Sequence, residues 1–229
     1  MLEWLWVFVA YLIGSIPFGL VIAHLFWHID PRRAGSGNIG ATNVTRLCGL
    51  PAGIVTLLFD AGKGVAALWL GLHLVLAPAG GEGLAPSPEA GLGHISLFIA
   101  LYGLAAILGH MHSIFLKFRG GKAVATTLGI FFYLAPLQTL LAALLCLLVI
   151  AWKKYVSLGS LVLVVSLPLI LLAWGRAELL PLAASSALLV INAHRPNIGR
   201  LLRGEEKTWR RSKKEQEADS PEPAEPRQR

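Results

Sequence analysis

The sequence predicts an all-α, polytopic membrane protein, and three observations support this fold class. Hydrophobic residues make up 55% of the 229 residues, charged residues make up only 14%, and the mean hydropathy is +0.64. Apolar runs recur along the chain at lengths near the ~20 residues that a bilayer-spanning helix needs. The Lys and Arg residues behind the net charge of +7 lie in short segments between these runs and in the C-terminal tail. Membrane orientation explains that distribution better than nucleic-acid binding does.

The apolar runs lie at residues 4–27, 51–76, 96–116, 124–151, 156–174 and 178–193. The first run is too long for the apolar region of a cleaved signal, and Glu3 stands where such a signal carries positive charge, so we expect a retained span. The run 124–151 contains Pro136, which removes a helical hydrogen bond and breaks or kinks a helix.

Charge placement decides how often the run 124–151 crosses the membrane. As one crossing, it would place Lys153, Lys154 and the basic tail opposite Arg46 and Lys122. As two short helices around Pro136 that go and return, it would place all of these groups on one side, as the positive-inside rule favours. We therefore predict seven transmembrane helices, two of them short, with the N-terminus outside and the C-terminus in the cytoplasm.

The domain organisation is expected to be simple. Residues 1–203 form a single transmembrane domain, and the charged, proline-containing residues 204–229 form a disordered cytoplasmic tail. The segment 77–95, rich in Gly, Pro and Ala, is expected to be an outside loop. Cys48 and Cys146 have neither a disulfide pattern nor metal-site spacing, and we expect no metal.

A first polar segment, residues 35–46, has the composition of an anion-binding loop. Gly35, Gly37 and Gly40 would let backbone N–H groups approach a phosphate, and Arg46 would supply a fixed charge. The small side chains that could add hydrogen bonds are Ser36, Asn38, Thr42 and Asn43. Taken alone, the segment could equally be a polar turn between membrane helices.

A second polar segment, residues 117–123, places Gly120, Gly121 and Lys122 directly before an apolar helix. A helix N-terminus with glycines and a lysine can seat a phosphate. The segment does not match a Walker A loop, because Leu116 stands at its first glycine and Ala123 at its Ser/Thr. A basic loop that merely marks the cytoplasmic side is the alternative.

A third polar segment, residues 194–203, begins with His194, which could shuttle a proton or donate a hydrogen bond. Asn197 is close enough in sequence to address the same ligand. An interfacial histidine before a basic helix is the simpler interpretation. Asp60 and Lys63, spaced to pair inside an apolar run, are expected to support the structure, although the sequence leaves open whether they contact substrate.

These segments, taken together, resemble the bacterial acyl-phosphate-dependent glycerol-3-phosphate acyltransferases. The resemblance covers nearly the whole predicted membrane domain, through residues 14–17, 36–46, 59–64, 108–110, 118–126, 157–159 and 194–201. By contrast, the H-x-x-x-x-D signature of acyl-CoA-dependent acyltransferases and the G-x-S-x-G nucleophile motif are absent from the sequence.

The resemblance implies transfer of an acyl group from acyl phosphate to the 1-hydroxyl of glycerol 3-phosphate, the first step of phospholipid synthesis. It implies a monomer in the bacterial inner membrane with its active site on the cytoplasmic face, and neither cofactor nor nucleic acid. Catalytic roles would fall to Ser36, Arg46, Lys122, His194 and Asn197. Substrate binding would fall to Gly37, Asn38, Thr42, Asn43, Gly120, Gly121 and Ser157.

The second segment departs from the family's usual K-G-G-K-G pattern. Arg119 keeps the charge of the first Lys, whereas Ala123 replaces the last Gly. We therefore expect the following helix to begin without a left-handed residue at position 123. Ser113 stands where the family often has Pro.

Three other functions remain open from the residues alone. One is a lipid-binding scaffold, although a scaffold would not need three polar segments that converge. A transporter or flippase for a phosphorylated lipid would also use anion-binding loops and broken helices, but it should show polar groups at the midplane and on both faces. An acyltransferase that takes acyl-CoA would differ only in its donor. The clustering of polar segments on one predicted face favours the acyl-phosphate enzyme.

Overall fold

The computed structural model describes residues 2–73 and 92–208, and these residues form helices and connections without a β-strand. The elements are α1 (Leu2–Ser15), α2 (Phe18–Trp27), α3 (Ala41–Cys48), α4 (Leu50–Gly71), α5 (Leu92–Met111), η3 (Ile114–Leu116), α6 (Val124–Leu134), α7 (Pro136–Lys153), α8 (Val156–Ala173), η4 (Ala177–Leu179), α9 (Leu180–Ala193) and α10 (Arg195–Arg203). Most of the expected outside loop 77–95, and the tail beyond residue 208, lie outside the described residues.

The all-α membrane architecture is confirmed. Five described spans are long and apolar enough to cross a bilayer, and a sixth is added if the bent pair of Ala177–Ala193 and Arg195–Leu202 counts as one span. Large apolar side chains lie exposed on the outer surface, as those of Leu147, Leu169 and Leu188 do at 61–69%. Exposed leucines of this kind suit contact with lipid tails.

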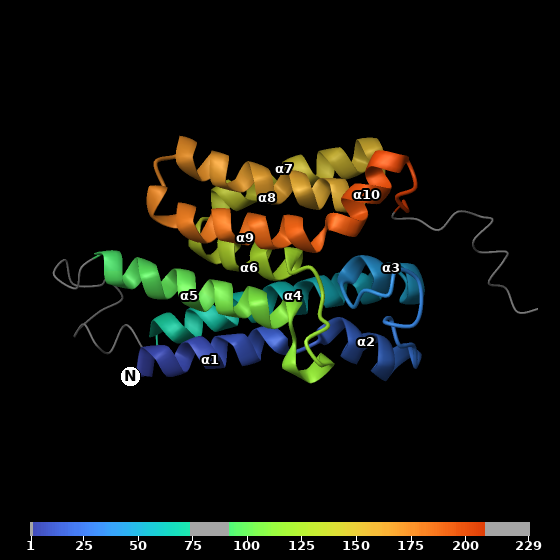
Figure 1. Cartoon of the computed structure of the whole chain (residues 1–229), viewed down its shortest axis with the longest axis horizontal. Helices are drawn as coiled ribbons and strands as arrows, with labels where there is room; N and C mark the ends of the chain where they lie inside the picture. Colours follow the sequence, from blue (N-terminus) through green and yellow to red (C-terminus); the bar gives the residue numbers. More distant parts are fainter. Residues whose placement is uncertain (1, 74–91, 209–229) are drawn as a thin grey trace, which may run out of the picture.

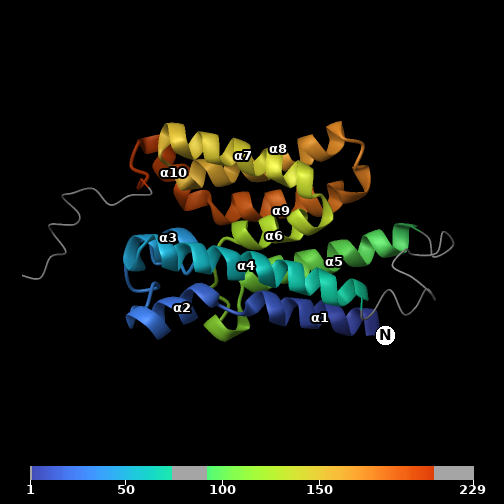
Figure 2. The same ribbon diagram turned by 180° about the vertical axis from the view of Figure 1, so that it is seen from behind.

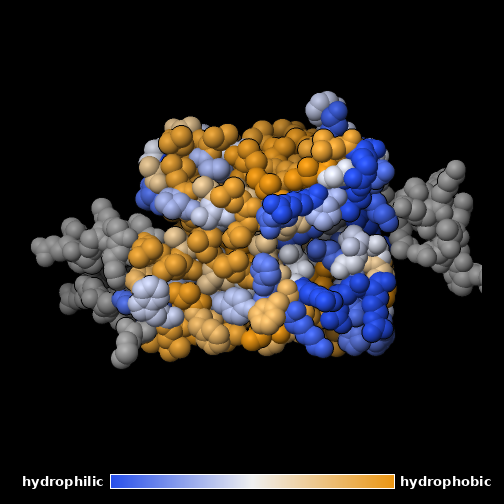
Figure 3. Space-filling view, in the orientation of Figure 1, coloured by the Kyte–Doolittle hydropathy of each residue, from blue (hydrophilic) through white to orange (hydrophobic). Residues whose placement is uncertain are grey.

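The helices run along the long axis of the molecule, and the polar segments gather at one end. This end carries α2, α3 and α10, whereas α1 begins at the opposite end (Figures 1 and 2). Figure 3 shows apolar residues over most of one face and hydrophilic residues concentrated at the α2–α3–α10 end. The chain is therefore asymmetric along the direction in which its helices would cross a membrane.

The predicted break at Pro136 is present. α6 has 11 residues and ends at Leu134, Ala135 leaves the helical region with φ −150° and ψ 69°, and α7 begins at Pro136. The chain reverses direction between α6 and α7 in both views (Figures 1 and 2). Pro at a first helical position is favourable because its missing N–H would have no helical partner there. α7 has 18 residues and is longer than the short helix expected.

A second break, at Ile16 and Pro17, divides the first apolar run into α1 and α2. A broken helix leaves backbone carbonyls without their usual partners. Here the Ser113 hydroxyl donates to the carbonyl of Ser15 at 2.6 Å, and Lys63 Nζ donates to that of Ile16 at 2.8 Å. A side chain from α4 and one from the connection between α5 and η3 thus stabilise a break inside the first span.

Glycines bring the central helices into backbone contact. A Cβ at Gly14 of α1 would lie 2.1 Å from the carbonyl oxygen of Ala106 in α5. A Cβ at Gly129 of α6 would lie 2.1 Å from the carbonyl oxygen of Ala61 in α4. Such approaches are typical of membrane helices, whose association depends on close van der Waals packing. They fix α5 against α1 and α6 against α4, and the second polar segment lies between α5 and α6.

Candidate active site

The first polar segment is organised around Asn43, which is buried in the first turn of α3. Its amide nitrogen donates to the carbonyls of Pro31, Ala34 and Asn38 at 2.8–3.1 Å, and its amide oxygen accepts the N–H of Ser36 at 2.8 Å. Because these bonds engage both polar atoms, Asn43 holds the loop in shape and does not point into open solvent. Sequence spacing alone could not separate this supporting role from substrate binding.

The loop that Asn43 closes needs two left-handed glycines. Gly35 has φ 64° and Gly37 has φ 71°, values that L side chains rarely adopt. The resulting turn leaves Ser36 exposed and Asn38 half-buried, and both line a cavity at the polar end. Thr42 is half-buried on α3 and is not among the residues lining that cavity.

The second polar segment is tied to the end of α5 by its glycines. The N–H of Gly120 donates to the carbonyl of Met111 at 2.9 Å, and the N–H of Gly121 donates to that of His110 at 3.0 Å. These two N–H groups therefore serve the loop itself, whereas the sequence suggested that they would face a phosphate. The glycines let the backbone of this segment approach the end of α5 closely, since a Cβ at Gly120 would lie 2.0 Å from the His110 carbonyl oxygen.

The expectation for Ala123 is wrong. This residue precedes α6 in the left-handed region, with φ 58° and ψ 14°. The hydrogen bonds that fix Gly120 and Gly121 against α5 hold the backbone in this conformation. They outweigh the preference of alanine for a negative φ. The family's usual glycine would fit this conformation with less strain.

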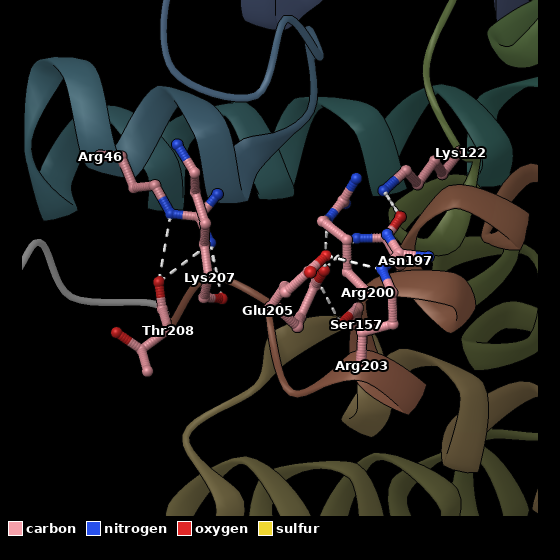
Figure 4. Close-up of polar contacts among 10 residues, drawn as sticks. Arg46, Lys122, Ser157, Asn197, Arg200, Arg203, Glu205, Lys207 and Thr208 are labelled. Carbon is pink, nitrogen blue, oxygen red and sulfur yellow. Dashed lines mark hydrogen bonds and ion pairs between the residues drawn. The ribbon is translucent and has the colours of Figure 1, made fainter.

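Lys122 extends from this segment to the third one. Its Nζ hydrogen-bonds the amide oxygen of Asn197 on α10 (Figure 4). The pKa of Lys122 is lowered to about 8, first by burial and then by the positive charges of Arg200 and Arg46, against the opposing effect of Glu206. Lys122 therefore lies close enough to Arg46, on a different polar segment, for the two charges to interact.

Glu206 lies at the centre of the polar contacts around α10. Its Oε1 accepts hydrogen bonds from Ser157 at 2.7 Å and Asn197 at 2.6 Å, and its Oε2 accepts one from Arg200 at 2.7 Å. Burial opposes ionisation, but these hydrogen bonds outweigh it and hold the pKa of the carboxyl below its ordinary value. Ser157, which the resemblance placed in substrate binding, here donates to Glu206.

Sequence reasoning missed Glu206 because it lies in a charged stretch that was read as a disordered tail. Residues 204–208 instead pack at the polar end, and the Glu206 side chain is only 5% exposed. The guanidinium of Arg46 donates to the backbone carbonyls of Lys207 and Thr208 at 3.0–3.3 Å (Figure 4). The start of the predicted tail is thus part of the site.

His194 is buried between α9 and α10, and its Nδ1 lies 2.8 Å from the carbonyl oxygen of Val190. A ring nitrogen beside a carbonyl carries the proton, which leaves Nε2 as the acceptor of a neutral imidazole. The pKa of His194 is lowered to about 4, chiefly by burial and then by the charge of Lys122. The side chain is therefore neutral at physiological pH.

A cavity of about 370 Å³ joins the three polar segments. The first segment contributes Ser36 and Asn38, the second contributes residues 120–122, and the third contributes Asn197 and Arg200. Arg46 and His194 do not line it, but the charge of Arg46 acts on Lys122, and the charge of Lys122 helps to lower the pKa of His194. The arrangement offers cations, hydroxyls and amides to an anionic ligand beside apolar helices.

Known proteins resemble the chain along nearly its whole described length. The family model of glycerol-3-phosphate acyltransferases matches residues 4–204. A protein of that name from Desulfovibrio desulfuricans is 47% identical over 93% of this chain and 87% of its own length. One from Lawsonia intracellularis is 44% identical over 92% of this chain and 98% of its own.

The fold is also similar to that of solved structures. The crystal structure of PlsY, an integral membrane glycerol 3-phosphate acyltransferase, in its glycerol 3-phosphate form has a TM-score of 0.79 and 38% identity. The similarity covers 91% of this chain and 96% of that one. The lysophosphatidic acid form of PlsY gives a TM-score of 0.76 at 36% identity. By sequence and by fold, the chain belongs to the glycerol-3-phosphate acyltransferase family.

Proposed function

We propose that this protein transfers an acyl group from acyl phosphate to the 1-hydroxyl of glycerol 3-phosphate, which yields 1-acylglycerol 3-phosphate and inorganic phosphate. The observation that carries this proposal is the cavity in which Ser36, Lys122 and Asn197, from three distant segments, meet at one end of a bundle of apolar helices. Both proposed substrates carry phosphate, and the donor also carries an acyl chain that belongs in lipid. A cationic cavity at the end of membrane helices suits both requirements.

The chemistry needs no covalent enzyme intermediate. An acyl phosphate is an activated mixed anhydride, so the glycerol hydroxyl oxygen can attack the acyl carbon directly while the bond to the phosphate oxygen breaks. The departing phosphate keeps that electron pair, and Lys122, Arg46 and Arg200 would stabilise its charge. The hydroxyl proton passes to His194 Nε2 or to an oxygen of a bound phosphate. A bound anion would raise the pKa of His194 from its low value of about 4.

The catalytic group in this proposal comprises Ser36, Arg46, Lys122, His194 and Asn197. Gly37, Asn38, Gly120 and Gly121 shape the binding surface, with Thr42 beside it on α3. Asn43 and Ser157 do not contact the substrate in this proposal. The amide of Asn43 bonds the backbone of the first polar segment, and the hydroxyl of Ser157 bonds Glu206. The enzyme requires no cofactor in this scheme and acts as a monomer.

The arrangement in the membrane follows from the concentration of hydrophilic residues at the α2–α3–α10 end of the molecule. We infer seven membrane helices, formed by α1 with α2, and by α4, α5, α6, α7, α8 and α9, with the active site on the cytoplasmic face of a bacterial inner membrane. The reversal after Leu134 supports this count, since it returns the chain to the polar end. α6 would span only about 16 Å at 1.5 Å per residue, so its ends must be covered by neighbouring helices.

An assay of the purified protein in detergent tests the reaction. With palmitoyl phosphate as donor, we expect release of inorganic phosphate only when glycerol 3-phosphate is present, in equal amount to the 1-acylglycerol 3-phosphate formed. Palmitoyl-CoA should not replace the donor, and Lys122→Ala serves as the low-activity control. Phosphate release that ignores glycerol 3-phosphate would argue for a hydrolase instead.

The charge state of Lys122 predicts a pH dependence. Below pH 8 its ammonium is protonated and can bind phosphate, and it loses that charge as pH rises through its pKa of about 8. We expect kcat/KM for glycerol 3-phosphate to fall about tenfold per pH unit above that value. Lys122→Arg, which stays charged, should have lower activity but no fall up to pH 9.5. A wild-type profile that stays flat through pH 9.5 would remove Lys122 from phosphate binding.

His194→Ala tests the proton acceptor. General-base help contributes about 10² to 10⁴ in rate, so we expect kcat to fall by at least about 10² with a smaller change in KM. Imidazole added to the buffer should restore part of the rate if Nε2 accepts the proton. A decrease in kcat of less than about tenfold would mean that an oxygen of a substrate phosphate, and not His194, accepts the proton.

Cysteine labelling tests the arrangement in the membrane. After Cys48 and Cys146 are replaced by Ala, single cysteines at Arg119 and Lys154 should react with an impermeant reagent only from the cytoplasmic side. A cysteine at Arg176 should react only from the outside. Labelling of positions 119 and 154 from opposite sides would mean that α6 and α7 form one crossing.

A further inference from the structure

The ion pair of Asp60 and Lys63 lies inside α4, away from the cavity. Lys63 Nζ is 2.7 Å from Asp60 Oδ1, and each side chain is only 2% exposed. Ionisable groups at such depth are costly, and they persist in membrane helices when they are paired and serve a function. The mechanism above uses neither residue.

Lys63 connects this pair to the break in the first span. Its Nζ donates to the carbonyl of Ile16 at 2.8 Å, next to Pro17. The neighbouring carbonyl, that of Ser15, accepts the hydroxyl of Ser113 from the connection between α5 and η3. The α1–α2 break is therefore held from two sides, by α4 and by the segment that leads into the second polar loop.

Asp60 connects the pair to His110 at the end of α5. His110 Nδ1 lies 3.6 Å from Asp60 Oδ1 and 3.3 Å from the hydroxyl oxygen of Thr126 in α6. The imidazole is 3% exposed, so three helices enclose it. His110 does not line the cavity.

The other edge of His110 supports the loop that carries Lys122. The His110 carbonyl accepts the N–H of Gly121 at 3.0 Å. A Cβ at Gly121 would lie 2.2 Å from His110 Nε2, so the loop backbone rests directly against the imidazole. The next residue, Lys122, reaches the cavity and Asn197.

We propose that Asp60, Lys63 and His110 are positioning residues that set the place of Gly121 and Lys122, and through them the binding of the phosphate of glycerol 3-phosphate. This inference rests on the proposed function of the cavity. The ion pair fixes the imidazole of His110 between α4, α5 and α6. The imidazole in turn supports the backbone of the second polar segment at Gly121. Apolar residues in their place could fill space but could not hold the ring in one orientation by directed charge interactions.

The contact between His110 and Gly121 can be tested by a rescue experiment. Gly121→Ala should raise KM for glycerol 3-phosphate by about tenfold or more, since misplacement by ~1 Å can cost ~10²-fold. His110→Asn keeps a polar atom near the position of Nδ1 and removes the edge that the new methyl would strike. Adding it to Gly121→Ala should return KM to within about threefold of His110→Asn alone.

Gly120→Ala is the matched control for this rescue. A Cβ at Gly120 would meet the backbone oxygen of His110 at 2.0 Å, which no side-chain change at position 110 removes. His110→Asn should therefore leave the Gly120→Ala defect unchanged. Equal rescue of both alanine variants, or of neither, would overturn the proposal that the imidazole supports the loop.

The ion pair is tested by removing both charges together, because one buried charge left alone can prevent folding. Asp60→Asn with Lys63→Gln should raise KM for glycerol 3-phosphate about fivefold or more with kcat within about threefold, the pattern of lost substrate positioning. Thr139→Ala is the control for stability alone. Thr139 is fully buried in α7 and bonds only the carbonyl of Ala135 among the contacts described for its side chain.

The outcomes separate the two proposals. If the paired variant lowers the melting temperature as Thr139→Ala does and leaves KM unchanged, the pair is structural only and the inference fails. If the wild-type protein shows no turnover with acyl phosphate and glycerol 3-phosphate in the same assay, the proposed function itself fails. Turnover by the wild type with a raised KM in the paired variant supports both.

Discussion

The structure depends on one constraint: inside a membrane, every backbone group released by a broken helix needs a partner from the protein. The bilayer core offers no water, so an unpaired carbonyl there is costly. At the first break Lys63 bonds the carbonyl of Ile16, and at the α6–α7 break Arg176 Nη2 lies 3.3 Å from that of Leu134. The breaks thus occur where a neighbouring segment supplies a donor, and they let the chain bring its polar segments to one end.

The electrostatics of the site follow from gathering cations at that end. Burial is the main cause of the low pKa of Lys122, and the positive charges of Arg200 and Arg46 lower it further. Part of this repulsion is offset by Glu206, which binds Arg200 and receives bonds from Ser157 and Asn197. A phosphate entering the cavity would offset more of it. Offsetting the positive charge in this way would favour the binding of an anionic ligand.

Much of this arrangement could be predicted from the sequence, because it depends on composition and on charge placement. Pro136 predicted the break, and the distribution of Lys and Arg between the two sides of the membrane predicted that the chain turns back there. The residue types in the three polar segments identified the cavity's main contributors. Glu206 could not be found in this way, since a carboxylate in a charged tail looks like any solvated one. Ala123 was misjudged because the bonds of Gly120 and Gly121 to α5 are tertiary contacts, which local backbone preference does not record.

The position of the cavity also limits where the reaction can take place. Moving an acyl chain out of lipid costs about 0.8 kcal/mol per CH₂ group, so in the proposed reaction the donor must keep its chain in the bilayer while its phosphate is bound. Lys122 lies two residues before α6 and Asn197 lies in the first turn of α10, so both are fixed relative to helix ends. The helix ends therefore set the depth at which the acyl carbon meets the glycerol hydroxyl. A flexible loop could not hold that depth, and the proposed support of the second polar segment by His110 would supply the rigidity that the chemistry needs.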